Sequence, residues 1–253
     1  MARELLDLLW RDHPAAPRGG ARGPRAKVTT SQAVDAAIAL ADTEGLEHLT
    51  VRRLAAELGI SGMALYTHVG SRDDLLVLMA DCVHARQPRA PYATGHWRAR
   101  VREVADADLA LYGEHDWLLD IADQRVSLGP GTIAKYDHDL HAFDHTGLDD
   151  VDRDAALTFV ADFTRAAARA RRPDPRAVDM AEVWSAWSER LTVYVGDDFP
   201  LARRVGAAAG AAAGAVLNTS YSPGAAWEFG IERLLDALAV LVGTASDDPG
   251  PTV

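Results

Sequence analysis

Residues 49–76 read LTVRRLAAELGISGMALYTHVGSRDDLL, and this stretch has the pattern of two short helices joined by a tight turn. Thr50 and Ser61 are each suited to cap the N-terminus of a helix, because a side-chain hydroxyl can accept a hydrogen bond from a free backbone N–H there. Gly59 permits the turn between the two helices, since glycine adopts backbone conformations that other residues avoid. The pattern predicts one helix over 51–58 and a second up to residue 66.

The flanking residues extend this helical pattern in both directions. Apolar residues recur at helical spacing from Thr30, and Gly45 ends that run. Ser71, with Asp74 at the capping-box position, begins another helix. Four helices within about 55 residues, joined by short turns, are typical of a helix-turn-helix arrangement.

The third helix of this arrangement projects an outward face that fits the major groove of B-DNA. Arg52 is placed to reach a groove, where arginine suits guanine. Thr50, Tyr66 and Arg72 are suited to phosphates, Thr50 because free N–H groups at a helix N-terminus favour an anion. Because several residues of the face carry no hydrogen-bonding side chain, we expect DNA shape to contribute to specificity. The face consists of Gly62, Met63, Ala64, Thr67 and His68.

This segment resembles the DNA-binding domain of the TetR family of bacterial transcriptional repressors. The matching positions are Thr50, Leu54-Ala55, Leu58-Gly59-Ile60, Leu65-Tyr66, His68-Val69, Arg72 and Leu75-Leu76. The family usually has lysine where this chain has Arg72, and arginine keeps a phosphate contact. Residues 115–147 and 226–242 look like the C-terminal regulatory domain of tetracycline-repressor-like members. The resemblance implies an all-α homodimer that binds a palindromic operator on double-stranded DNA and releases it when a small-molecule effector enters the larger domain.

We therefore expect an all-α chain organised in four parts. They are a flexible basic N-terminal arm at 1–29, a helix-turn-helix DNA-binding domain at 30–86, a helical regulatory, ligand-binding and dimerisation domain at 96–245, and a disordered tail at 246–253. Residues 1–13 within the arm are either a short amphipathic helix or a frayed tail. In the regulatory domain the pattern predicts helices near 96–112, 115–122, 132–147, 152–172, 178–195, 200–217 and 225–243.

The arm has a local excess of positive charge. Residues 18–27 contain Arg18, Arg22, Arg25 and Lys27 and no acidic residue. Arg22, Arg25 and Lys27 are candidates for the minor groove or for phosphates. The alternative is a solvated linker rich in proline, glycine and arginine.

Aromatic side chains concentrate in the regulatory part, and they suit the lining of a drug-sized apolar pocket. Taken singly, each aromatic residue is more often part of the core or of a dimer interface than a ligand contact, and it is as a group that they point to a pocket. The candidate ligand-binding residues are His115, Trp117, Tyr136, Phe159, Asp162, Phe163 and Trp184. Residues 155–168 and 226–242 are candidates for a four-helix dimer interface, with burial inside one subunit as the alternative.

An alternative hypothesis is that the chain is a helical metal-dependent enzyme. His138, His141 and His145 are spaced to share one helical face, and histidines with nearby carboxylates can hold a divalent ion. A partly exposed polar face gives the same pattern, and no compact ligand set such as HExxH is present. We therefore expect no catalytic residue, no metal and no cofactor.

Composition excludes several classes of protein. The net charge of −11 argues against a general polyanion binder, and the single cysteine excludes an intramolecular disulfide and favours a cytoplasmic chain. No apolar run is long enough to span a membrane. The N-terminus, MARELLDLLWR, does not read as a signal peptide.

Overall fold

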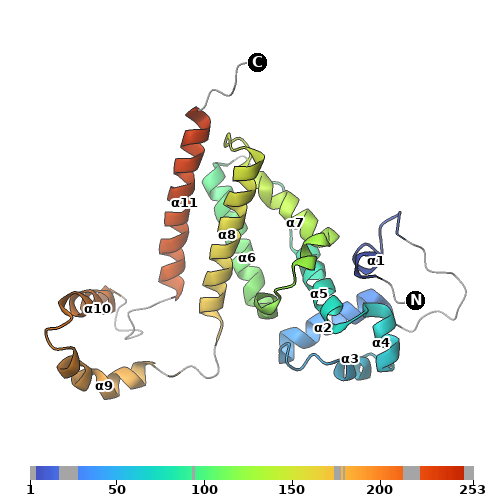
Figure 1. Cartoon of the computed structure of the whole chain (residues 1–253), viewed down its shortest axis with the longest axis horizontal. Helices are drawn as coiled ribbons and strands as arrows, with labels where there is room; N and C mark the ends of the chain where they lie inside the picture. The colour runs from blue at the N-terminus through green and yellow to red at the C-terminus, as the bar shows by residue number, and fades with distance from the viewer. Residues whose placement is uncertain are drawn as a thin grey trace, which may run out of the picture.

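The structure is a computed structural model that describes residues 4–16, 28–92, 95–173, 178, 180–212 and 223–247. These residues form helices and turns with no strand among them, which confirms the expected all-α fold (Figure 1). In chain order the elements are α1 (Leu5–Leu9), α2 (Thr30–Glu44), α3 (Val51–Glu57), α4 (Gly62–Val69), α5 (Arg72–Arg86), α6 (Trp97–Glu114), the 3-10 turns η1 (Asp116–Asp120) and η2 (Gln124–Leu128), α7 (Pro130–Leu140), the 3-10 turn η3 (His141–Phe143), α8 (Asp150–Arg171), α9 (Met180–Val195), α10 (Pro200–Ala212) and α11 (Pro223–Asp247).

Helices α2 to α5 pack around one hydrophobic core. Val34 of α2, Leu54 of α3, Leu65 of α4 and Met79 of α5 are completely buried there. Burying a side chain of this size stabilises a fold by about 1.5–3 kcal/mol. The core therefore fixes how the four helices cross one another.

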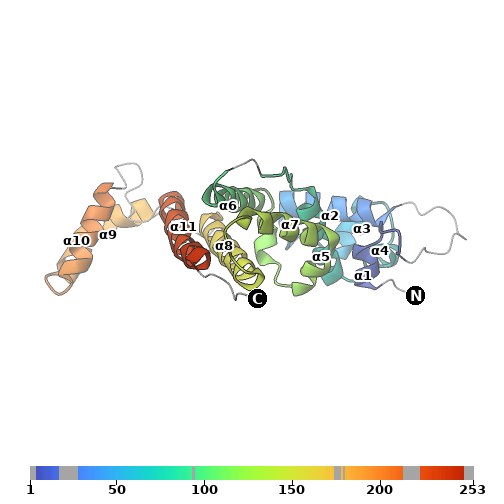
Figure 2. The ribbon, with the colours of Figure 1, turned by 90° about the horizontal axis from the view of Figure 1, so that it is seen from above.

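A second core lies between α6, η3, α8 and α11. Helix α6 belongs to both cores, because Leu109 packs against each of them. The turn η1, directly after α6, belongs to the first core through Trp117, Leu118 and Leu119. Seen from above, α7 lies between the α2–α5 group and the α8–α11 pair, and α6 runs beside α8 (Figure 2).

Helix α5 also packs along α7, and a close approach at the start of α7 makes this possible. A Cβ at Gly131 would lie 2.2 Å from the backbone oxygen of Asp81, so only glycine fits. The carboxylate of Asp81 accepts a hydrogen bond from the Thr132 N–H at 2.8 Å, and burial raises the pKa of that carboxyl group. Helix α5 thus links the α2–α4 group to the larger part of the molecule.

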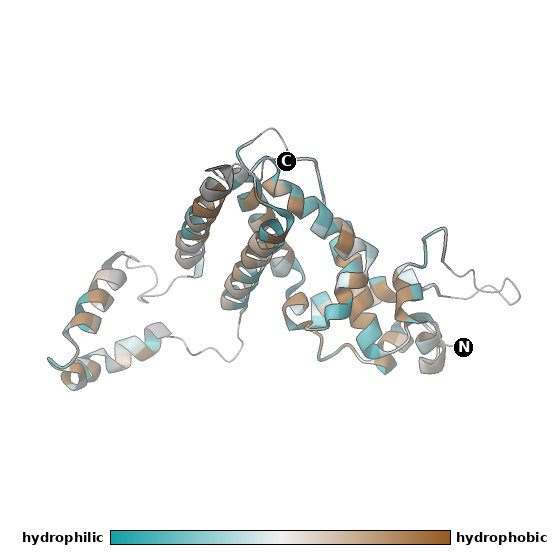
Figure 3. Ribbon diagram, turned by 45° about the horizontal axis from the view of Figure 1, so that its top comes forward, coloured by the Kyte–Doolittle hydropathy of each residue, from teal (hydrophilic) through white to brown (hydrophobic). Residues whose placement is uncertain are grey.

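Helices α8 and α11 cross closely through aromatic packing. The ring of Phe163 stacks on Trp227 with centroids 5.5 Å apart. Figure 3 shows hydrophobic and hydrophilic residues together along these helices, as in amphipathic helices. Helices α9 and α10 stand apart from the other helices in both Figure 1 and Figure 2.

Several parts of the structure differ from the sequence expectations. Helix α4 does not end at residue 66 but runs to Val69, where Gly70 follows with a φ of 75°, and the helix expected near 115–122 is the shorter 3-10 turn η1. Within the arm at 1–29, residues 5–9 form α1, whose Leu8 and Leu9 are buried in the first core. The helix expected over 132–147 begins at Pro130, a residue favoured at the first helical position, and ends at Leu140. It ends early because Arg100 of α6 binds the backbone oxygens of residues 142 and 144 and turns the chain inward. Helix α11 continues to Asp247, and 248–253 lie outside the described residues.

Candidate nucleic-acid interface

The turn between α3 and α4 is built by local hydrogen bonds that the sequence predicts. The Thr50 hydroxyl accepts a hydrogen bond from the Arg53 N–H at 3.1 Å and caps α3, and Ser61 caps α4 in the same way. Gly59 has a φ of 64°, and the next N–H, of Ile60, donates to the oxygen of Ala55 at 3.0 Å. These contacts fix α4 on α3 with little freedom.

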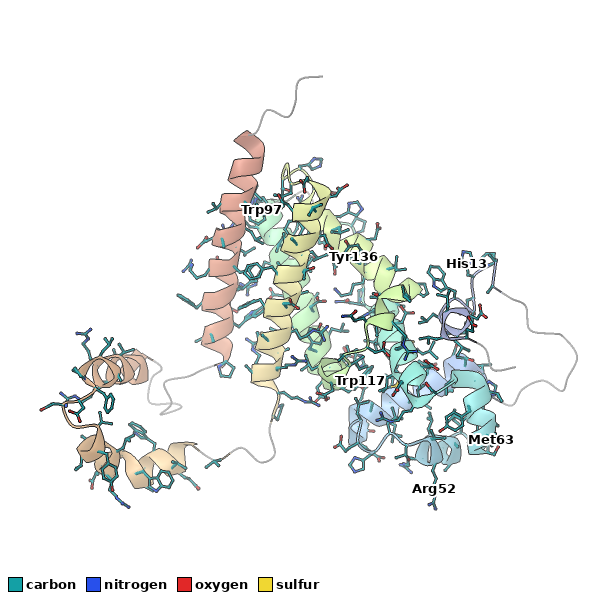
Figure 4. The ribbon with its side chains drawn as sticks, in the orientation of Figure 1. His13, Arg52, Met63, Trp97, Trp117 and Tyr136 are labelled. Atoms are coloured by element: carbon teal, nitrogen blue, oxygen red, sulfur yellow. The ribbon has the colours of Figure 1, made fainter. Side chains whose placement is uncertain are left out.

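Helix α4 has one buried side and one exposed side. Leu65 and Val69 point into the first core, and Met63 is 78% exposed. In Figure 4 the side chains of Met63 and Arg52 point away from the body of the molecule. Thr67 is exposed, although its hydroxyl donates to the oxygen of Ala64 at 2.6 Å. Gly62, Ala64 and His68 are half-buried on α4, and the structure brings the predicted recognition residues onto this one helix.

The three residues predicted to contact phosphates differ in whether their side chains are already hydrogen-bonded within the protein. Thr50 and Tyr66 are exposed, and the hydroxyl group of Tyr66 has no hydrogen bond among the described residues. Arg72 donates to the backbone oxygens of Leu46 at 3.2 Å and Leu49 at 3.4 Å. Its guanidinium therefore fastens the loop before α3, a contact that sequence spacing does not reveal.

Arg52 and Arg53 are neighbours with different surroundings. Arg53 donates to Glu44 of α2 at 2.9 Å, and this partner raises the pKa of its guanidinium above the ordinary value. Arg52 is exposed and has no such partner among the described residues. The predicted arm residues Arg22, Arg25 and Lys27 lie outside the described residues.

The structure does not gather the seven predicted ligand-binding residues into one site. His115 and Trp117 both contact Asp42 of α2. Tyr136 is exposed on α7 and donates to Asp154 at 2.7 Å, and Trp184 is exposed on α9. Phe159, Asp162 and Phe163 lie along α8, with only Phe163 packed against another helix.

A cavity of about 830 Å³ lies instead beside the start of α6 and the end of α7. It is lined by the segment before α6, by the first turn of α6, and by the end of α7 with the turn and loop after it. Its residues are Arg89, Pro91, Tyr92, Gly95, His96, Arg100, Asp137, His138, His141, Asp144 and His145. None of the seven predicted ligand-binding residues lines this cavity, and the sequence analysis considered its three histidines only as a possible metal face.

The three histidines are not on one helix, contrary to the alternative reading. His138 lies in the last turn of α7, His141 begins η3, and His145 lies in a loop with a φ of 65°. His138 is occupied at both ring nitrogens, by Tyr92 at 3.2 Å and by the oxygen of Ala90 at 2.9 Å. Among the described residues no three histidine, cysteine or acidic side chains form a group able to hold a metal ion.

Buried charges lie between α5, α6 and α7, and the sequence analysis missed them. Lys135 of α7 forms ion pairs with Asp108 of α6, at 2.9 Å, and with Asp139. Burial alone lowers the pKa of Lys135, but the two carboxylates raise it by a larger amount. The net pKa is above the ordinary value, so the ammonium group stays charged. Nearby, burial and the charge of Lys135 lower the pKa of His84 to about 4. The Lys135–Asp139 pair is one helical turn apart on α7, but Asp108 lies 27 residues before Lys135, and a regular helical pattern holds no signal for a contact at that distance.

In the described part of the chain, no helix is both long and apolar enough to cross a membrane.

Family models match both parts of the chain. Residues 33–79 match the model described as bacterial regulatory proteins, tetR family. Residues 90–242, more than half of the chain, match the model of the tetracyclin repressor-like C-terminal domain.

Individual relatives agree with these models. The chain is 33% identical to the HTH-type transcriptional repressor DrrR1 of Streptomyces coeruleorubidus, over 97% of this chain and 88% of that protein. The crystal structure of apo ActR from Streptomyces coelicolor superposes with a TM-score of 0.70 at 26% identity, covering 88% of this chain and all of ActR. ActR in complex with actinorhodin superposes with a TM-score of 0.68 at 27% identity, covering 86% of this chain and all of that one.

With its exposed α4 held on α3 and both parts of its length matched, the chain belongs to the TetR family of DNA-binding transcriptional regulators, which are not enzymes.

Proposed function

We propose that this regulator is a ligand-responsive repressor that binds a palindromic operator as a homodimer and is released from it by a small amphipathic molecule. The observation that carries the proposal is the exposed side of α4, opposite buried Leu65 and Val69. A helix held in this way can enter a major groove without disturbing the core.

In this proposal each subunit places α4 in one major groove. Met63 and Ala64 contact thymine methyl groups, and Thr67 and His68 meet base edges together with Arg52 of α3. Thr50 and Tyr66 contact phosphates on either side. Arg72 contributes by holding the loop before α3 and by its positive charge at that edge.

The dimer would form through α8 and α11. Phe159 of α8 is exposed, and so are Phe229 and Val240 of α11, with Phe229 67% exposed. Exposed aromatic side chains on neighbouring long helices are typical of an interaction surface. Two such helices from each subunit make a four-helix interface, and its two-fold symmetry matches that of a palindromic operator.

The effector would bind the larger domain of this chain, and the relative ActR is known in complex with a small molecule, actinorhodin. The cavity beside α6 and α7 has a volume within the range of drug-sized pockets, and its imidazole and phenol rings suit an amphipathic molecule. Arg89 of its wall donates to the oxygens of His84 and Ala85, at the end of α5. A molecule that displaces Arg89 therefore disturbs the helix that follows α4 and packs against it.

In vitro selection from a random duplex pool, followed by fluorescence anisotropy with a salt titration and a scrambled duplex as control, tests this proposal. We expect a selected palindrome, bound far more tightly than the scrambled duplex and with a steep loss of affinity in salt. Equal affinity for both duplexes would contradict the proposal. Release of the palindrome by one member of a panel of amphipathic aromatic compounds tests the effector part.

A further inference from the structure

The turn η1 lies between the DNA-binding helices and the regulatory helices, although it follows α6 in sequence. Trp117, Leu118 and Leu119 of η1 are buried in the core that α2 to α5 build. Figure 4 shows Trp117 at the junction of the two parts. A side chain of α2 binds this segment from the DNA-binding part, and side chains at the end of α8 bind it from the regulatory part.

On the DNA-binding side the partner is Asp42 of α2. One oxygen of its carboxylate, Oδ1, accepts hydrogen bonds from Trp117 Nε1 at 2.6 Å and from His115 Nδ1 at 2.8 Å. Trp117 is completely buried, and the Asp42 side chain is 27% exposed. Hydrogen bonds to a charged acceptor are stronger than neutral ones, and the buried indole N–H would have no partner without this carboxylate.

On the regulatory side the partner is the last turn of α8. Arg172 Nη1 contacts Asp120 at 2.7 Å, and its Nε contacts Asp116 at 3.1 Å. Arg169 donates to the oxygen of Leu119 at 2.7 Å. A displacement of α8 therefore displaces η1 and, through Trp117 and His115, the end of α2.

We propose that Asp42 is a positioning residue that holds the α2–α5 domain in its DNA-competent orientation by binding His115 and Trp117 of the regulatory part. The inference rests on the proposed function. In a dimer the orientation of each domain sets the separation of the two α4 helices, which must match half-sites about 34–36 Å apart. When the contact opens, the domain samples other orientations, and the affinity for the operator falls with the fraction that remains competent.

The first test compares Asp42→Ala with Asp35→Ala, measured on the duplex that the wild-type protein selects. Asp35 is a matched control because it lies on the same helix and pairs with Arg86 of α5, away from η1. We expect Asp42→Ala to weaken binding to the selected duplex about tenfold, if about one dimer in ten keeps both domains competent, and to leave binding to a scrambled duplex unchanged. Asp35→Ala should retain the wild-type ratio of the two affinities. Equal ratios in the two variants would overturn the inference.

A second readout needs no DNA. Hydrogen exchange should be faster at the η1 amides and the last turn of α2 in Asp42→Ala than in Asp35→Ala, because the local opening costs less free energy. Unchanged exchange at both places would overturn the inference. If the wild-type protein selects no sequence, the proposed function fails, and this measurement still decides the role of Asp42.

Asp42→Asn keeps the test available if the alanine variant does not fold. The amide has the same size and still accepts a hydrogen bond, but it carries no charge. We expect an affinity ratio and an exchange rate between those of wild type and Asp42→Ala, and wild-type values in both would overturn the inference.

Discussion

Gly230 of α11 faces the ring of Phe163 of α8 so closely that a Cβ at position 230 would lie 2.4 Å from the ring carbon Cζ. The ring cannot turn aside easily, because it also stacks on Trp227. The crossing of α8 and α11, which we propose as part of the dimer interface, therefore requires glycine at this position.

Gly230→Ala should lower the free energy of unfolding by about 1–3 kcal/mol, because the added methyl group overpacks the crossing. Gly243→Ala is the matched control on the same helix, since no atom lies within 4 Å of the added carbon. It should raise that free energy by up to about 1 kcal/mol through helix propensity alone. Urea denaturation followed by circular dichroism measures both, and stabilisation by both substitutions would contradict the packing argument.

Arg52→Ala should weaken binding to the selected operator by about 1–3 kcal/mol and relax the preference at one base pair, if Arg52 contacts a base edge. Arg53→Ala should have a smaller effect, because the Arg53 side chain is already paired with Glu44. Anisotropy titrations on the operator and on single-base variants of it compare the two. A larger loss for Arg53→Ala would show that the assignments are reversed.

Burial lowers the pKa of His84 to about 4 in the folded state, below the ordinary value of 6.5. The unfolded chain therefore binds more protons between these two values. The contribution of this group to stability is fully present above pH 6.5 and is lost as the pH falls towards 4, by on the order of 3 kcal/mol in total.

His84→Gln should therefore flatten the fall in stability between pH 6.5 and pH 4, as measured by urea denaturation at several pH values. His48→Gln is the control, because the His48 side chain is 60% exposed. A pH profile of His84→Gln as steep as that of the control variant would be inconsistent with a buried neutral imidazole.

Lys135→Met should destabilise the protein by about 3–5 kcal/mol, because it leaves Asp108 and Asp139 buried without their shared cation. Adding Asp108→Asn and Asp139→Asn to this variant removes both negative charges and should restore much of the loss. Thermal unfolding of the single and triple variants measures the difference. No recovery in the triple variant would mean that the packing of the lysine stem, not its charge, is what matters.

The turns of the DNA-binding domain could be predicted from sequence because their determinants are local. Thr50, Gly59 and Ser61 act on backbone groups within a few residues of themselves, and the structure has them as the sequence predicts. The helix predicted near 178–195 is also present, as α9, and it ends at Val195 as expected.

The ligand-binding candidates could not be placed from sequence because their partners are distant. Asp42 lies 73 residues before His115, and no helical periodicity relates them. In the same way, Arg100 ends α7 by binding oxygens more than 40 residues away. Aromatic composition identified the domain that holds such contacts but not which ring faces which helix.

Leu109 packs against both hydrophobic cores. If either core unfolds, Leu109 loses contacts that also stabilise the other core. The DNA-binding and regulatory parts should therefore denature as one thermodynamic unit, with the calorimetric enthalpy equal to the van 't Hoff enthalpy once the oligomeric state is taken into account. If the chain acts as we propose, heat or proteolysis should therefore abolish operator binding and effector binding together.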